Sequence, residues 1–164
     1  MGDEIRTERL LLRRATYEDA AAMHRIMSNP VAMRYWSTPA HERFDETERW
    51  IASMVDDDAS ERDDFIVTLG GELIGKLGAW RLPEFGFLIE PAHWGKGYAG
   101  EALTAFIERR RNAGSAKLTA DVDPRNVSSI RLLERHGFVE TGRKSGTWQV
   151  GDELCDSVYF QLEL

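Results

Sequence analysis

A glycine-rich segment in the second half of the chain is the feature whose residue types and spacing most directly suggest chemistry. Its glycines follow the pattern Gly95-x-Gly97-x-x-Gly100, and the residues after it have the apolar periodicity of a helix. Glycines let a backbone approach an anion closely, and the free N–H groups at a helix start form a positive pole. The segment is therefore predicted to bind a phosphate-bearing ligand; the alternative is a glycine-rich helix start without a ligand.

The same spacing occurs in the dinucleotide-binding fingerprint, and Asp121 lies about 20 residues further on, where a ribose-binding acid would be sought. That fingerprint needs its first glycine directly at the end of the first strand of a doubly wound sheet. Here a helix pair and a strand meander come first, and four residues separate Glu90 from Gly95. A dinucleotide site is therefore disfavoured. A P-loop is excluded, because Lys96 is followed by Gly97 where that loop needs Ser or Thr.

Hydrophobic periodicity predicts the elements that position this loop. Alternating or continuous apolar runs predict strands over residues 9–14, 65–69, 73–80, 84–89, 117–122, 138–150 and 154–162. Apolar residues at helical spacing predict helices over residues 17–27, 46–55, from the loop to 112, and 127–135. This order indicates an α+β fold with a mixed sheet of about six to seven strands and about four helices. Residues 1–164 are expected to form a single domain.

The composition excludes several classes of protein. The chain has 164 residues, of which 42% are hydrophobic and 30% are charged, and its net charge is −7. These values exclude a disordered or collagen-like chain, and no apolar run approaches the ~18 residues of a membrane span. A cytoplasmic protein without membrane or nucleic-acid partners is expected. The single cysteine, Cys155, cannot form an internal disulfide, and the four histidines lack metal-ligand spacing, so no metal is expected.

A combination of motifs begins at the glycine loop and continues through the next helix. It consists of Trp94-Gly95-Lys96-Gly97-Tyr98-Ala99, Glu101-Ala102-Leu103, Asn126-x-x-Ser129-x-x-Leu132-Leu133-Glu134 and Gly137-Phe138. These motifs resemble those of the GNAT acyltransferases, in particular the RimJ/RimL-like branch. The resemblance covers nearly the whole chain and includes Arg9-Leu10-Leu11-Leu12-Arg13 at its start. Trp94 departs from the first position of the superfamily's loop pattern, which is usually Gln or Arg, and the branch tolerates this change.

The resemblance implies a GNAT fold, in which a mixed, mostly antiparallel sheet is splayed at its centre. It also implies an acetyl-CoA-dependent N-acetyltransferase that transfers an acetyl group directly to a primary amine. The acceptor would be a protein N-terminal amine or a small-molecule amine. The alternative function is a non-catalytic acyl-CoA-binding module of the same fold, and a homodimer is left open.

The resemblance further implies roles for individual residues. The pyrophosphate of acetyl-CoA would lie on the N–H groups of residues 95–100, and its pantetheine arm would run beside the strand 84–89. The residues expected to contact the cofactor are Phe87, Leu88, Ile89, Trp94, Gly95, Lys96, Gly97, Tyr98, Ala99, Gly100, Asn126 and Ser129. Asn126 would hold the cofactor arm, and it is also placed to cap the helix that follows.

Acetyl transfer needs a neutral amine, a polarised carbonyl and protonation of the departing thiolate. Glu84 is the expected general base; the alternative is a carboxylate at a strand start that faces solvent. A backbone N–H near Leu88 is expected to polarise the carbonyl. Many members protonate the thiolate with a tyrosine, but Leu133 stands at that position here. The resemblance makes Ser129 the substitute; the alternative is an ordinary hydroxyl on the helix surface.

The acceptor site is expected on the other side of the splay, between the loop 31–44 and the closing hairpin. Its expected aromatic lining is Tyr35, Trp36, Trp80 and Trp148. Carboxylates on that side would favour cationic amines. The run Arg109-Arg110-Arg111 is interpreted as the solvated face of its helix, and contact with the 3′-phosphate of CoA is the less favoured alternative.

Overall fold

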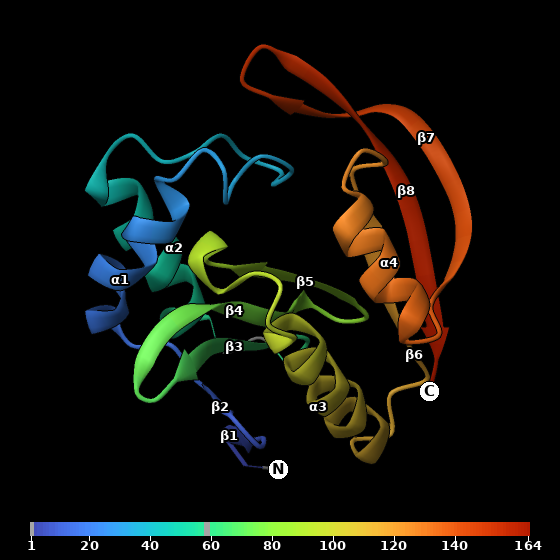
Figure 1. Ribbon diagram of the computed structural model, residues 1–164, viewed down its shortest axis with the longest axis horizontal. Helices are drawn as coiled ribbons and strands as arrows, with labels where there is room; N and C mark the ends of the chain where they lie inside the picture. Colours follow the sequence, from blue (N-terminus) through green and yellow to red (C-terminus); the bar gives the residue numbers. More distant parts are fainter. Residues whose placement is uncertain (1, 58–59) are drawn as a thin grey trace.

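A mixed sheet with helices on both faces forms the framework of the protein in the computed structural model, which describes residues 2–57 and 60–164 (Figure 1). Within this part of the chain the strands are β1 (Glu4–Arg6), β2 (Leu10–Arg13), β3 (Asp63–Leu69), β4 (Glu72–Arg81), β5 (Glu84–Ile89), β6 (Lys117–Val122), β7 (Val139–Val150) and β8 (Glu153–Glu163). The helices are α1 (Ala20–Met27), α2 (Phe44–Asp56), α3 (Tyr98–Asn112) and α4 (Val127–Arg135). The spatial strand order is β1-β2-β3-β4-β5-β6-β8-β7.

These elements confirm the predicted α+β class and the mostly antiparallel sheet, since β5–β6 is the one parallel pair among the described strands. The prediction of about six to seven strands was too low, because the sheet has eight. The missed strand is β1, whose three residues are too few for a periodic signal and are mostly exposed. The predicted helix 17–27 also begins with a 3₁₀ turn, Tyr17–Asp19.

The centre of the sheet is splayed between β5 and β6. The two strands pair in register only at Glu84 and Thr119, and the Thr119 N–H donates to the Pro83 carbonyl at 2.9 Å. On its other edge β5 pairs with β4 as far as Ile89. Beyond Glu84, therefore, the edge of β5 that faces β6 is separated from that strand, as the resemblance implied (Figure 1).

Apolar packing fixes the helices on opposite faces of the sheet. On one face α3 and α4 cover a core that includes Phe65, Phe85, Phe106, Leu133 and Phe138. On the other face α1 and α2 cover a second core, with Met23, Ile26, Ile51, Ile66 and Leu88. Because successive strand residues face opposite sides, Phe85 and Leu88 of β5 belong to different cores. The strand at the splay is thus anchored from both faces.

A buried ion cluster connects α3 to the N-terminal strands. The carboxylate of Asp63, 4% exposed, accepts hydrogen bonds from Arg14 at 3.0 Å, Arg109 at 2.9 Å and Arg110 at 2.7 Å. The interpretation of the run 109–111 as a solvated face was therefore wrong for Arg109 and Arg110. Both guanidinium groups are held by Asp63, and their side chains are only 9% and 13% exposed.

Replacing Asp63 with asparagine is expected to lower the free energy of unfolding by about 3 kcal/mol, because it leaves three guanidinium groups without their carboxylate. Burial alone would raise the pKa of Asp63, but hydrogen bonds from Arg109 and Arg110 outweigh it and lower that pKa. The stabilisation is therefore complete above the pKa of an unfolded aspartate, about 3.9, and is lost as pH falls below it. Urea unfolding at neutral and acidic pH measures both effects.

The matched control is Asp45→Asn, which removes an exposed carboxylate paired with Arg43 and Arg49. Exposed pairs contribute about 0–1 kcal/mol, so this variant should unfold nearly as the wild type does. Equal stability of Asp63→Asn and Asp45→Asn at neutral pH would contradict the role given to the buried cluster.

Candidate functional site

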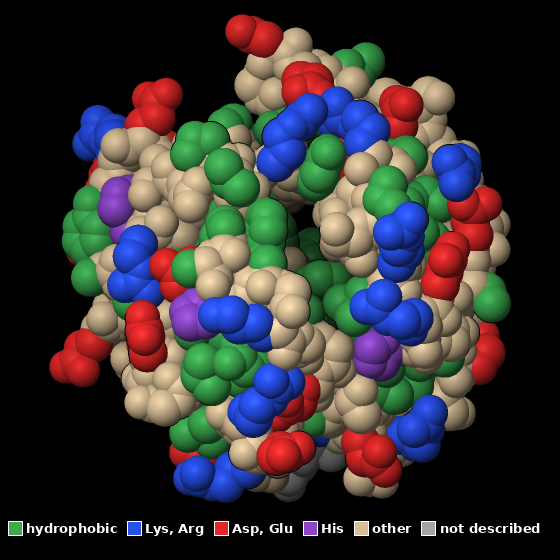
Figure 2. Space-filling model, viewed as in Figure 1, with side chains coloured by type: hydrophobic (Ala, Val, Ile, Leu, Met, Phe, Trp, Pro, Cys, Tyr) green, Lys and Arg blue, Asp and Glu red, His purple; other side chains and the backbone are tan. Residues whose placement is uncertain are grey.

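A cavity of about 1050 Å³ lies at the splay. Its wall is formed by the end of β5, the glycine loop, the first turns of α3, the length of α4 and the loop that follows α1. Figure 2 shows this face of the molecule hollowed between its two halves, with hydrophobic side chains deep in the hollow. The volume slightly exceeds the ~300–1,000 Å³ typical of ligand pockets, so the cavity has room for a large ligand.

The structure brings almost all of the predicted cofactor residues to this cavity. Those that line it are Phe87, Leu88, Ile89, Trp94, Gly95, Gly97, Tyr98, Ala99, Gly100, Asn126 and Ser129. Lys96 is the exception: its exposed side chain lies outside the lining, with its Nζ 3.4 Å from the Ala92 carbonyl. The predicted acceptor residues Tyr35 and Trp36 also line the cavity.

The glycine loop adopts a conformation that requires glycine. Gly95 and Gly97 have φ angles of +72° and +83°, which disfavour residues with a side chain. Gly97 is the N-cap of α3, and the first N–H groups of a helix have no partner within it. The loop therefore presents backbone donors and the positive end of a helix dipole at the cavity, as an anion site requires.

Arg9 holds this loop in place, a role that sequence reasoning missed. Its Nε donates to Glu101 at 2.7 Å, its Nη1 donates to the Lys96 carbonyl at 2.9 Å, and its guanidinium lies 4.5 Å from the ring centre of Tyr98. Thr7 adds a hydrogen bond to Glu101 at 2.6 Å. The position of Arg9 in the expected first strand gave no indication of a partner 92 residues away.

Arginine and histidine side chains line the cavity although the chain is acidic. They are Arg34, His93, Arg131, Arg135 and His136. The one carboxylate of the lining is Glu101, which is already paired with Arg9. A chain with net charge −7 thus presents a locally positive surface, which favours a polyanionic ligand.

The first turn of α4 places Asn126 and Ser129 together. Asn126 is the N-cap of this helix, and its Oδ1 accepts a hydrogen bond from the Ser129 N–H at 3.3 Å. Ser129 is half-buried and lines the cavity, so its hydroxyl is available to a ligand there. Leu133, one turn further on, is buried in the core. Of these two positions, therefore, Ser129 supplies a hydroxyl at the cavity, whereas Leu133 has none to offer.

Glu84, Trp80 and Trp148 lie outside the cavity lining and form a second group around Asp121. Burial and the nearby charge of Asp121 raise the pKa of Glu84, and a hydrogen bond from Trp80 works in the opposite direction. Trp148 donates its Nε1–H to the Asp121 carboxylate at 3.0 Å. Glu84 and Asp121 have no ion pair with a basic side chain among the described residues. This group is therefore negatively charged, in contrast to the cavity.

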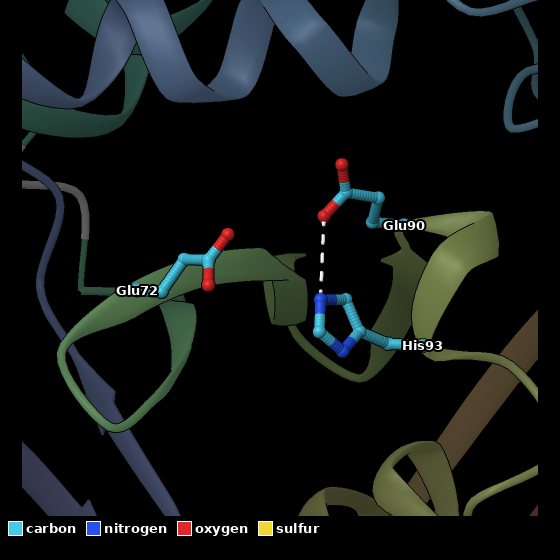
Figure 3. Close-up of side chains that lie close together, drawn as sticks. All are labelled: Glu72, Glu90 and His93. Carbon is cyan, nitrogen blue, oxygen red and sulfur yellow. Dashed lines mark ion pairs between the residues drawn. The ribbon is translucent and has the colours of Figure 1, made fainter.

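Three side chains in the described part of the chain come closest to a metal-ligand set. They are Glu72, Glu90 and His93, whose donor atoms lie within 4.8 Å of one another (Figure 3). Arg25 already pairs with both carboxylates, at 2.8 Å from Glu90 and 3.6 Å from Glu72. Because one guanidinium already pairs with both carboxylates, their geometry is that of an ion-pair cluster. The prediction that no metal is used stays a prediction.

The chain is similar in sequence to known proteins. Residues 9–139 match the family described as "Acetyltransferase (GNAT) domain". A spermidine N(1)-acetyltransferase of Vibrio cholerae serotype O1 is 31% identical over 139 residues, which are 81% of this chain and 80% of the relative. None of the helices in the described residues is long and apolar enough to cross a membrane.

Two solved structures share the fold over nearly the whole chain. The ribosomal L7/L12 α-N-protein acetyltransferase RimL superposes with a TM-score of 0.88 at 16% identity, covering 100% of this chain and 96% of that one. A spermidine N-acetyltransferase from Vibrio cholerae, in complex with CoA and spermine, superposes with a TM-score of 0.78 at 25% identity, covering 94% and 95%. The expected likeness to the RimJ/RimL-like branch is thus confirmed at the level of fold.

Proposed function

The chain belongs to the GNAT family of acetyltransferases, and on this premise we propose that it transfers the acetyl group of acetyl-CoA directly to a primary amine. The observation that carries this proposal is the positively lined cavity at the splay, which combines a glycine loop, a helix N-terminus and a separated strand edge. A solved relative with the same fold binds CoA, which supports the choice of cofactor.

In this proposal the two ends of the cavity bind different parts of acetyl-CoA. The N–H groups of residues 95–100 bind the pyrophosphate, and Arg131 and Arg135 supply further positive charge at the same wall. The separated edge of β5 at residues 87–89 offers backbone groups to the amides of the pantetheine arm. Asn126 lies where that arm passes α4.

The proposed chemistry forms one bond and breaks one. The neutral amine nitrogen forms a C–N bond with the acetyl carbon, and the C–S bond to CoA breaks. Because Glu84 lies outside the cavity lining, the proton lost by the amine passes to it through a water molecule, and the N–H near Leu88 polarises the carbonyl oxygen. Ser129 gives a proton to the departing thiolate, and a water molecule returns a proton to its hydroxyl while Glu84 releases the amine proton to solvent. No covalent enzyme intermediate is formed, so Cys155 has no part in the reaction.

Glu84→Gln is expected to lower kcat/KM about 100-fold, the lower range for loss of a general base. The carboxylate is the active form, so in the wild type kcat/KM falls as pH drops through the raised pKa of Glu84. Asp121→Asn removes the neighbouring negative charge and should shift this limb of the pH profile to lower pH. An Asp121→Asn profile that superposes on the wild type, or a Glu84→Gln rate within threefold of it, would contradict this role.

The acceptor in this proposal is a cationic amine that binds beside Glu84 and Asp121. Both carboxylates lack an ion-pair partner among the described residues, and the indoles of Trp80 and Trp148 are exposed beside them. Exposed aromatic faces and carboxylates together attract ammonium groups. The relative named for spermidine acetylation supports a polycationic acceptor for this chain.

Release of CoA thiol across a panel of amines tests the proposed function. Thiol release matched by an equal amount of acetylated amine is the expected result, with faster turnover of diamines than of anionic amino acids. Acetyl-CoA binding without thiol release for any amine would favour the alternative, a non-catalytic acyl-CoA-binding module. Thermal stabilisation by NAD and none by acetyl-CoA would contradict both.

A further inference from the structure

The splay divides the sheet into two halves, one with β1–β5 and the other with β6–β8. Beyond the splay, the parts of the molecule on these two sides contact each other again. At the sheet they are joined by the single register pair of Glu84 and Thr119. Further out, the loop after α1 meets the β6–α4 loop and the start of β8 through four side chains. We name this group the arginine strap; it consists of Arg34, Tyr35, Arg125 and Glu153.

The strap is a continuous network of charges and one aromatic ring. Glu153 pairs with Arg34, at 3.8 Å, and with Arg125. The guanidinium groups of Arg34 and Arg125 lie 4.9 Å and 5.7 Å from the ring centre of Tyr35. Asp123 fixes Arg125 through an Nη2–Oδ2 contact of 2.6 Å. The ring of Tyr35, from one half, is thus bound by a guanidinium from each half.

The strap borders the proposed reaction site. Arg34 and Tyr35 line the cavity, and Trp36, the next residue, approaches Gly86 of β5. Figure 2 shows basic side chains above the hollow, between the two halves. The same loop approaches the turn of the β7–β8 hairpin a second time, because Pro39 lies 3.9 Å from the position a Cβ would take on Gly151. The splay is therefore closed by pairing at one end and bridged by the strap at the other.

The ion pairs of the strap are strong enough together to hold it in place beside the cavity, so it can limit the size of an acceptor that enters. Arg34, Arg125 and Glu153 are 44–50% exposed, and exposed ion pairs are weak one by one but stronger as a network. We propose that the arginine strap selects acceptors by width: it admits slender amines and excludes amines with a bulky group near the reacting nitrogen. This inference rests on the proposed function. A filter of this kind favours small-molecule amines as acceptors over the N-terminal amine of a folded protein.

The test compares two acceptors that differ in bulk beside the reacting nitrogen. One is butane-1,4-diamine, and the other is the same diamine with a tert-butyl group on each carbon that bears a nitrogen, so both keep two primary amines and two positive charges. Each is assayed for kcat/KM by thiol release and for Kd by calorimetry against the CoA-loaded protein. The variant is Glu153→Ala, and the control is Glu140→Ala, which breaks an exposed pair with Arg143 on β7.

We expect the wild type and Glu140→Ala to prefer the slender diamine by at least about 100-fold, and Glu153→Ala to reduce this ratio to below about 10-fold, a change of 1.4 kcal/mol. The KM for acetyl-CoA should not change. A wild-type ratio near one, or an equal ratio in Glu153→Ala, would overturn the filter. Binding of the diamines without thiol release would count against the proposed function, while the calorimetric ratio would still decide the filter.

Discussion

Replacing Gly100 with leucine is expected to weaken acetyl-CoA binding by about 100-fold while leaving the protein folded. Gly100 lies in the first turn of α3, where it lines the cavity opposite α4. A leucine side chain would occupy the space in which we place the pyrophosphate. Losing two hydrogen bonds to a charged group, each contributing ~1.5 kcal/mol, corresponds to that factor. Calorimetric titration with acetyl-CoA measures the change.

Gly100→Ala is the matched control for this substitution. A Cβ at this position would lie 3.5 Å from Leu132 and 3.6 Å from His136, which are ordinary contacts, and alanine is a better helix former than glycine. This variant should therefore bind acetyl-CoA within about threefold of the wild type, since it removes none of the hydrogen bonds considered above. Wild-type affinity in a folded Gly100→Leu protein would show that the pyrophosphate does not lie on this helix start.

Replacing Ser129 with alanine is expected to lower kcat about 100-fold, a typical loss for one general acid. The substitution leaves the hydrogen bond from the backbone N–H of residue 129 to Asn126 Oδ1, so the cap of α4 and the path of the cofactor arm should persist. The KM for acetyl-CoA should therefore change little, and the loss should appear in kcat. Steady-state kinetics with a saturating diamine separates the two constants.

Ser128→Ala is the control for the Ser129 prediction. Ser128 also lines the cavity, on the same turn of α4, but we assign it no role in the reaction. Its loss should leave kcat within about twofold of the wild type, since surface substitutions without a specific role have small effects. Equal kcat values for Ser128→Ala and Ser129→Ala would contradict the role of Ser129 as the proton donor.

Local sequence patterns predicted the elements that build the cofactor side of the site. The bounds of β5, β6 and α4 follow their apolar periodicity, and all three elements have the predicted limits. The glycine spacing predicted the helix start. The structure shows why glycine stands there, because Gly95 and Gly97 have positive φ angles that few other residues adopt. Motif resemblance added Asn126 and Ser129, which periodicity alone would have placed only on a helix.

Long-range charge partners could not be predicted in the same way. Arg9 and Glu101 are 92 positions apart, and a strand arginine has no periodicity that identifies its partner. The sequence Arg109-Arg110-Arg111 has the polarity of an exposed face, yet Arg109 and Arg110 both pair with the buried carboxylate of Asp63. The arginine strap was missed for the same reason, since it joins three loops or strand starts that only the fold brings together.

The structure brings fewer of the residues predicted for the acceptor side to the cavity than of those predicted for the cofactor side. Tyr35 and Trp36 line the cavity, whereas Trp80 and Trp148 contact the carboxylates of Glu84 and Asp121 outside it. The sequence shows which residues are aromatic but not where their side chains point, because the strand register decides which face each side chain occupies. The grouping of acids and indoles on one face is thus a property of the folded sheet.

A crystal structure with CoA and butane-1,4-diamine is the decisive test of the proposed function. We expect the pyrophosphate on the N–H groups of residues 95–100, the thiol beside Ser129, and the diamine on the side of Glu84 and Asp121. One amine nitrogen should point along the splay toward the sulfur. CoA bound outside the cavity, or a diamine bound away from Glu84 and Asp121, would contradict it.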